Sequence, residues 1–158
     1  MGLDATVYCD CFETRNLKEP APCQNVFVSA DGSLECPSKD LDELLTFDQW
    51  LLHRACAHPD GILFHHRVGN LAQVELLRSE LESEGEMFPV LLGKVLHSGT
   101  HAGDHLSSED IVEMQRELGK LTKLICSTEM NQVYVDRFRE QMIELAGVAL
   151  RVGKPISF

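Results

Sequence analysis

The sequence predicts a mostly helical α+β domain in which a small antiparallel sheet from the N-terminal third packs on about five helices. Segments with the alternating, β-prone pattern of strands lie mainly in the first third of the chain. Apolar residues recur at intervals of three and four over most of the remainder, as is typical of amphipathic helices. With 158 residues, 44% of them hydrophobic, the chain has the length of one domain and enough apolar side chains for an ordinary core. We therefore expect residues 1–158 to form a single domain.

The N-terminal strands are indicated by residue alternation and by one turn signal. The stretch from Leu3 to Cys11 alternates and is β-prone, so we expect a strand there. After a loop with two prolines at 16–24, residues 26–28 lead into Asp31-Gly32. This dipeptide favours a hairpin because glycine readily adopts a positive φ.

The first helix is expected to begin at Asp40, where Glu43 completes a capping box, and to end before Pro59-Asp60-Gly61. Its predicted inner face consists of apolar residues at helical spacing, widened by Trp50: Leu41, Leu44, Leu45, Leu51, Leu52 and Ala55. The segment 61–69 that follows, "GILFHHRVG", is short and lies between turn signals, so we interpret it as a strand.

Four further helices are expected downstream. Asn70 caps the first of them, and Phe88-Pro89 starts a short second one, with proline at a tolerated first-turn position. Ser107 and Asp110 form a capping box ahead of the third, and the fourth ends at Gly153. The last two should pack as an antiparallel pair, and residues 156–158 are a candidate late strand.

The charge of the chain narrows the range of partners. The formal net charge is −11, from 14 Lys and Arg against 25 Asp and Glu, and no basic cluster is longer than a pair. Nucleic-acid binding and docking on an anionic membrane are therefore not expected, because both need clustered cations. A basic protein is electrostatically the better partner, but the leading interpretation of the acidity is the simpler one, that it keeps the protein soluble.

The location is predicted from what the sequence lacks. No stretch approaches the run of roughly 18 apolar residues that spans a bilayer. The first residues do not have the basic and then apolar pattern of a secretory signal. We expect a cytoplasmic protein.

Six cysteines raise the question of disulfides and metal sites. Without an export signal and with a core of its own, the chain is not expected to need disulfides. No Cys-x-x-Cys pair is present. Cys9 and Cys11 should point to the same face of a strand, and we interpret them first as small buried apolar residues. A metal-binding role for this pair is the lesser alternative, because the sequence offers no obvious second ligand pair.

The stretch "HSGTHAGDH" at 97–105 holds three of the seven histidines. Gly99 and Gly103 disfavour a helix, so we predict that Ser98 to His105 is a loop. We also predict that the side chains of Thr100, His101 and Asp104 converge on one side of it. Two sets of candidates follow: for acid–base catalysis Thr100, His101, Asp104 and His105, and for binding zinc or another divalent metal His97, His101, His105 and Asp104. The simpler hypothesis, which we favour, is that Asp104 caps turn amides and the histidines are solvated.

The other histidines receive structural interpretations. His65 and His66 are adjacent on a predicted strand and should point to opposite faces. His58 follows Cys56 by two residues, where the first helix is expected to end, a position that suits a cation at the negative end of the helix dipole.

Four segments carry a resemblance to known sequences: "GLDATVYCDCFE" at 2–13, the stretch 47–70, "SGTHAGD" at 98–104 and "GKPISF" at 153–158. Together they resemble a group of small bacterial cytoplasmic proteins of uncharacterised function, over nearly the whole chain. The resemblance implies a single cytoplasmic domain. It carries no activity, cofactor or catalytic residue across.

Two functions follow as hypotheses. The leading one is a non-catalytic protein-interaction or regulatory, inhibitor-like module with no cofactor and a basic partner. The alternative is a metal-dependent or acid–base enzyme that uses the loop at 97–105. The usual catalytic motifs are missing, which favours the first hypothesis. A surface that responds to pH through its histidines is a third hypothesis.

Overall fold

The computed structural model describes residues 2–98 and 104–158. The predicted class is confirmed: the fold is α+β, 51% helical, with a four-stranded antiparallel sheet and a separate two-stranded sheet. The five expected helices are found in the described residues, although the third of them is only a short π-helical segment, Leu91–Val95.

The main sheet draws its strands from along the whole chain. Its order is β4 (Ile62–Asn70), β1 (Gly2–Tyr8), β6 (Ile156–Ser157) and β5 (His105–Leu106), all antiparallel. The sheet was expected to come from the N-terminal third, but of the described residues in that third only β1 enters it. The predicted hairpin, β2 (Phe27–Val28) with β3 (Leu34–Glu35), forms the separate two-stranded sheet.

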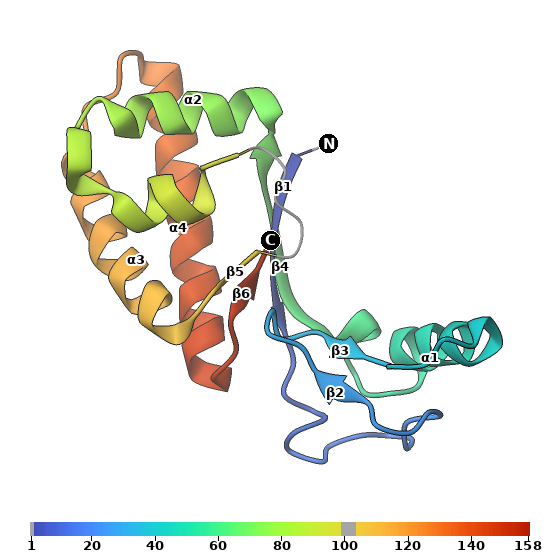
Figure 1. The fold of residues 1–158 in the computed structure, drawn as a ribbon. Coiled ribbons are helices and arrows are strands. Elements are labelled where there is room, and N and C mark those ends of the chain that lie inside the picture. Colours follow the sequence, from blue (N-terminus) through green and yellow to red (C-terminus); the bar gives the residue numbers. More distant parts are fainter. Residues whose placement is uncertain (1, 99–103) are drawn as a thin grey trace.

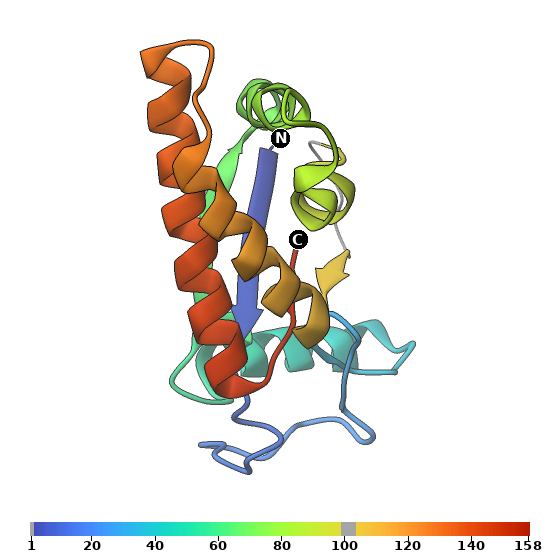
Figure 2. The same ribbon diagram turned by 90° about the vertical axis from the view of Figure 1, so that its left-hand side faces the viewer.

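Three long helices cover one side of the main sheet (Figures 1 and 2). They are α2 (Leu71–Glu82), α3 (Ser108–Lys120) and α4 (Glu129–Val152), and α3 and α4 pack against each other as predicted. Capping boxes at Asn70 and Ser107 begin α2 and α3, and Gly153, at φ 67°, ends α4. Apolar side chains from the sheet and these helices form one large core, with Leu3, Leu81, Leu106, Ile111 and Phe138 among its fully buried members.

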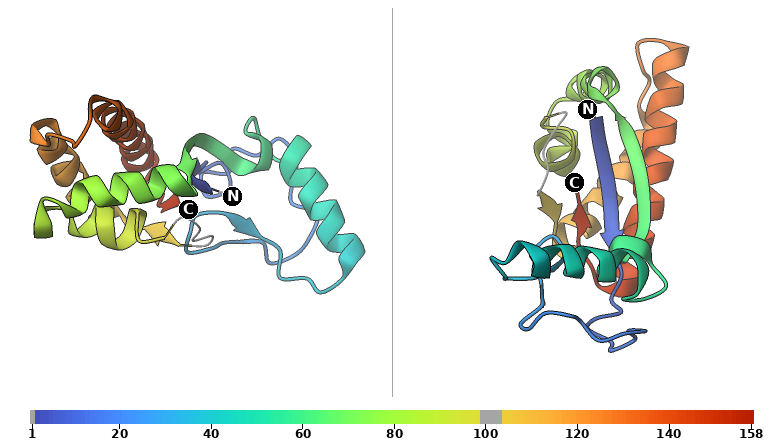
Figure 3. Two further views of the ribbon diagram at one scale, coloured as in Figure 1. Left: turned by 90° about the horizontal axis from the view of Figure 1, so that it is seen from above. Right: turned by 90° about the vertical axis from the view of Figure 1, so that its right-hand side faces the viewer.

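A smaller unit, here called the small lobe (residues 9–61), projects from the end of β1 and β4 on the side away from α2 (Figures 1 and 3). It contains the β2–β3 hairpin and α1 (Leu41–His53). It has two small buried clusters, one of Cys23, Phe47, Trp50 and Ala55 and one of Cys9, Cys11 and Cys56.

The predicted inner face of α1 is correct only in part. Trp50 and Ala55 are buried as expected, but Leu41 and Leu45 are 69% and 54% exposed, and the buried face also contains Phe47, which was not predicted. The helix does not pack on the main core. It is covered by loop and hairpin segments of the lobe, and the Trp50 indole donates a hydrogen bond to the Glu19 carbonyl at 3.1 Å.

The C-terminal strand attaches the lobe to the main core. The buried Lys154 ammonium forms an ion pair with Glu13 and reaches the Gly32 carbonyl at 3.4 Å. Two residues past Pro155, the Ser157 hydroxyl donates to the Asp31 carboxylate at 3.2 Å. The Asp31-Gly32 turn of the hairpin therefore rests on the last residues of the chain.

No helix in the described part of the chain is both long enough and apolar enough to cross a bilayer.

Candidate metal centre

Four potential metal ligands meet where the small lobe joins the sheet. Cys9 and Cys11 follow β1, and Cys56 and His58 follow α1. Their ligand atoms, three thiol sulfurs and one imidazole nitrogen, all lie within 4.8 Å of one another. The three cysteines are buried and His58 is half-buried, so the set lies beneath the surface with one side near solvent.

Backbone hydrogen bonds bring the two ligand segments together. The Cys9 amide donates to the Gly61 carbonyl at 2.7 Å, which extends the pairing of β1 with β4 beyond the strand. The Lys18 amide donates to the Ala55 carbonyl at 2.8 Å, just before Cys56. The turn at Asp60 and Gly61 has positive φ at both residues, 54° and 68°, and directs the chain from the second ligand pair into β4.

The spacing of the ligand atoms matches a tetrahedral zinc site. Zinc–sulfur bonds of about 2.3 Å place two sulfurs of a tetrahedron about 3.8 Å apart, and a sulfur and a nitrogen roughly 3.6 Å apart. The Sγ atoms of Cys9 and Cys56 are 3.8 Å apart. The His58 Nδ1 lies 3.5 Å from the Cys11 Sγ and 3.8 Å from the Cys56 Sγ. These three separations match three of the six edges of one tetrahedron, and the other three are below 4.8 Å.

Both ligand pairs also provide hydrogen bonds to sulfur. The His58 amide donates to the Cys56 Sγ at 3.4 Å. Burial raises the pKa of the Cys9 thiol, and the hydrogen bond from the Cys11 backbone amide opposes that rise. Amide donors of this kind stabilise a thiolate, which is the form of cysteine that binds a metal.

The site favours a cation for electrostatic reasons. Burial raises the pKa of Cys11 to about 12, and the neighbouring Cys9 and Cys56 add to the effect. Three thiolates so close together would repel one another in an apolar setting that includes Leu17 and Leu63. A divalent metal held by these residues would remove this penalty, since it would favour the thiolate form and neutralise its charge.

The metal alternative for Cys9 and Cys11 lacked a second ligand pair, and the structure brings one beside them. Because α1 ends at His53, His58 lies beyond its last turn, and the helix-dipole role does not apply. The missed signal was that Cys56-x-His58 repeats the spacing of Cys9-x-Cys11.

The histidine segment is described only in part. Thr100 and His101 lie outside the described residues, as does most of the predicted loop. The His97 Nε2 is 3.5 Å from the Asp104 carboxylate. His105 lies in the short strand β5, opposite Ser157, and not in a loop.

A surface depression of about 380 Å³ is lined by Gly93, Lys94, His97, Asp104 and His105. Among the described residues of this segment, no three ligand atoms gather as closely as those of Cys9, Cys11, Cys56 and His58. His65 and His66 contact different partners: His65 lies near Thr6 and Asp4, and His66 bonds to Glu144 of α4 at 2.6 Å.

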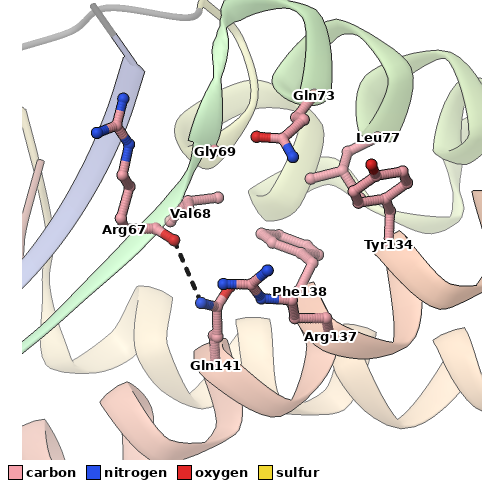
Figure 4. Close-up of a pocket in the computed structure, with 9 residues that line it drawn as sticks. All are labelled: Arg67, Val68, Gly69, Gln73, Leu77, Tyr134, Arg137, Phe138 and Gln141. Carbon is pink, nitrogen blue, oxygen red and sulfur yellow. Dashed lines mark hydrogen bonds between the residues drawn. The ribbon is translucent and has the colours of Figure 1, made fainter.

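A small polar cavity lies between β4, α2 and α4 (Figure 4). Its volume is about 90 Å³, room for a few water molecules. The Gln141 amide donates to the Arg67 carbonyl at 3.2 Å, but its buried Oε1 has no hydrogen-bond partner in the described part of the chain. The Arg67 guanidinium points away from the cavity in Figure 4.

No protein family, curated protein or solved structure matches the chain.

Proposed function

We propose that this protein is a non-catalytic interaction module whose small lobe is held in place by zinc bound to Cys9, Cys11, Cys56 and His58. The observation that carries the metal part is the set of three ligand separations, 3.8, 3.5 and 3.8 Å, which fit one tetrahedron. The sequence alone favours no cofactor, with zinc as the lesser alternative. The ligand separations support zinc instead.

The chemistry of the ligands selects the metal. Thiolate and imidazole ligands suit zinc, whereas magnesium and calcium require oxygen. Four protein ligands, from the pairs Cys9-x-Cys11 and Cys56-x-His58, fill a tetrahedral shell and leave no position for a substrate. A closed site of this type stabilises structure, and the lobe needs such support because its own buried clusters are small.

Cobalt binding tests the metal assignment, because Co²⁺ occupies zinc sites and has visible and thiolate charge-transfer bands. We expect the His58→Ala variant to bind cobalt far more weakly than the unsubstituted protein. His58→Cys should restore tight binding with a stronger thiolate band, since it supplies a fourth sulfur. Cys126→Ser is the matched control, because Cys126 lies in the main core region, away from the site. Equal cobalt affinity in the His58→Ala variant and the unsubstituted protein would refute this ligand set.

The interaction role is supported by charge and by exposed apolar side chains. The net charge of −11 favours a basic partner. Ile125, Met130 and Val133 are exposed around the start of α4, beside Glu129, and can supply apolar contacts. Association with a co-purified basic protein should weaken between about 0.1 M and 1 M salt, as the Debye length falls from about 10 to 3 Å. A partner whose binding does not change with salt would contradict the electrostatic proposal.

A second candidate function rests on the depression lined by Lys94, His97, Asp104 and His105. The His97 Nε2 lies 3.5 Å from the Asp104 carboxylate, so a small closing movement would form the hydrogen bond through which a carboxylate orients an imidazole for proton transfer. If this site is catalytic, His97→Gln should abolish an activity that survives removal of zinc from the cysteine site. A His97→Gln variant that keeps full activity would exclude that role.

A further inference from the structure

A second group of ligand atoms lies in the same lobe, apart from the first. The thiols of Cys23 and Cys36 and the carboxylate of Glu43 lie within 4.8 Å of one another. They come from three segments: the loop before β2, the residue after β3, and the first turn of α1. The cysteines flank the hairpin, and Glu43 belongs to the helix beside it.

We propose that Cys23, Cys36 and Glu43 form a second metal site, which binds zinc through three protein ligands and leaves the fourth position open. This site is separate from the Cys9, Cys11, Cys56 and His58 centre and does not depend on it for its ligands.

The Glu43 carboxylate is already oriented for such a role. The Ser38 hydroxyl donates to its Oε2 at 2.5 Å and itself accepts from the Asp40 amide at 3.1 Å. The Glu43 backbone is fixed by the Asp40 cap, whose carboxylate accepts from its amide at 3.3 Å. A hydrogen-bonded second shell of this kind holds a metal-ligating carboxylate in position.

The charges of the group favour a cation. When ionised, two thiolates and one carboxylate carry three negative charges, and a divalent metal neutralises two of them. If Cys23 and Cys36 were only small apolar residues, there would be no reason for the Glu43 carboxylate to lie within 4.8 Å of both thiols. A mixed sulfur and oxygen ligand set still suits zinc, which accepts both.

The open position follows from the surroundings. Cys23 is buried, but Cys36 and Glu43 are half-buried, and Glu43 lines a surface cavity of about 430 Å³. The other lining residues are Pro22, Gln24, Asn25, Pro37 and Ser38. Water or a small donor ligand can therefore reach the metal, which is the coordination found where zinc binds exchangeable ligands.

The two sites have different structural roles. The first joins the end of α1 to the end of β1, and the second joins the hairpin to the start of α1. Together they brace a unit whose larger buried cluster contains Cys23, Phe47, Trp50 and Ala55. Units this small commonly use metals in place of a larger core.

Cobalt stoichiometry tests the second site in the full chain. We expect the reduced, metal-free protein to bind two cobalt ions per chain, and the Glu43→Gln and Cys36→Ser variants to bind one. Glu35→Gln is the matched control, because Glu35 is exposed, next to Cys36 and outside the ligand set, and it should still bind two. Added imidazole should shift the visible bands of the second cobalt only, because only that ion has an open position.

Each other outcome overturns the proposal. One cobalt per chain that the Glu43→Gln and Cys36→Ser variants still bind removes the second site, as does a Glu43→Gln variant that binds two ions with unchanged affinity. Visible bands of both ions that ignore imidazole remove the open position. The first site is judged separately: a single cobalt with the charge-transfer intensity of three thiolates would overturn this inference and leave the Cys9, Cys11, Cys56 and His58 centre intact.

Discussion

Removing the metal from the Cys9, Cys11, Cys56 and His58 site should lower the free energy of unfolding by about 4 kcal/mol. The ion joins Cys9 to Cys56, which are 47 positions apart. A cross-link that closes a loop of this length lowers the chain entropy of the unfolded state, which raises the free energy of that state by about 4 kcal/mol at 25 °C. Mass action gives a similar value, about 4 kcal/mol for a ligand present at a thousand times its Kd.

The measurement is urea unfolding, followed by circular dichroism, of the Glu43→Gln variant with zinc and with a chelator. This variant removes the proposed second site, so the difference belongs to the first. The same loss should lower the melting temperature by roughly 10 °C, since 1 kcal/mol shifts Tm by about 2–4 °C at this size. In a Glu43→Gln chain that also carries Cys56→Ser, the chelator should have little effect. Identical unfolding with and without the chelator in the parent variant would refute the reasoning.

Three further predictions concern the contacts that hold the fold together. The Ser127 hydroxyl and amide hold the pKa of Glu80 below its usual range. This contribution is present above the unfolded pKa and is lost as the pH falls through the folded one, so Glu80→Gln should cost about 1–3 kcal/mol at pH 7. Urea unfolding should show that difference shrinking below about pH 4; a constant difference would contradict it. Lys154→Met should cost about 1–3 kcal/mol, below the value for a fully buried pair because the partner Glu13 is 42% exposed. A double-mutant cycle with Glu13→Gln measures the coupling energy between the two side chains, and a coupling energy of zero would show that the ion pair does not stabilise the fold. Leu41→Ala should change the free energy of unfolding by less than about 0.5 kcal/mol, whereas Trp50→Ala should lower it by about 3–5 kcal/mol. Thermal melts in which Leu41→Ala is the more destabilising change would contradict the burial of Trp50 and the exposure of Leu41.

Local signals predicted most of the helices correctly. Capping boxes at Asn70 and Ser107 and the glycine at 153 mark real helix ends, because caps depend on residues within one turn. The predicted face of α1 was only partly correct, because periodicity shows an apolar face without showing what covers it. Trp50 is buried as predicted, but Leu41 and Leu45 satisfy the pattern and are exposed, while the lobe packs against Phe47.

Long-range pairing explains what the sequence could not predict. The strand at 156–157 was expected, but its insertion between β1 and β5 depends on contacts from both ends of the chain. The buried Glu117 likewise accepts hydrogen bonds from the amides of Val90 and Leu91, both at 2.8 Å, across a separation that no local pattern reveals. Burial raises the pKa of this carboxyl.

The candidate metal centre shows the same limit. Each ligand pair is visible in the sequence, but the two become one site only through the register of β1 with β4 and the bond from Cys9 to Gly61. Of the histidine segment, the described residues bring His97 and Asp104 together, and the convergence predicted for Thr100, His101 and Asp104 stays a prediction.

Zinc K-edge X-ray absorption tests the central claim most directly. It should be measured on the Cys36→Ser, Glu43→Gln variant loaded with one equivalent of zinc, so that the first site alone contributes. The account predicts three sulfur atoms at about 2.3 Å and one imidazole nitrogen at about 2.0 Å. A shell of nitrogen and oxygen without sulfur, or failure of this variant to retain zinc, would contradict it.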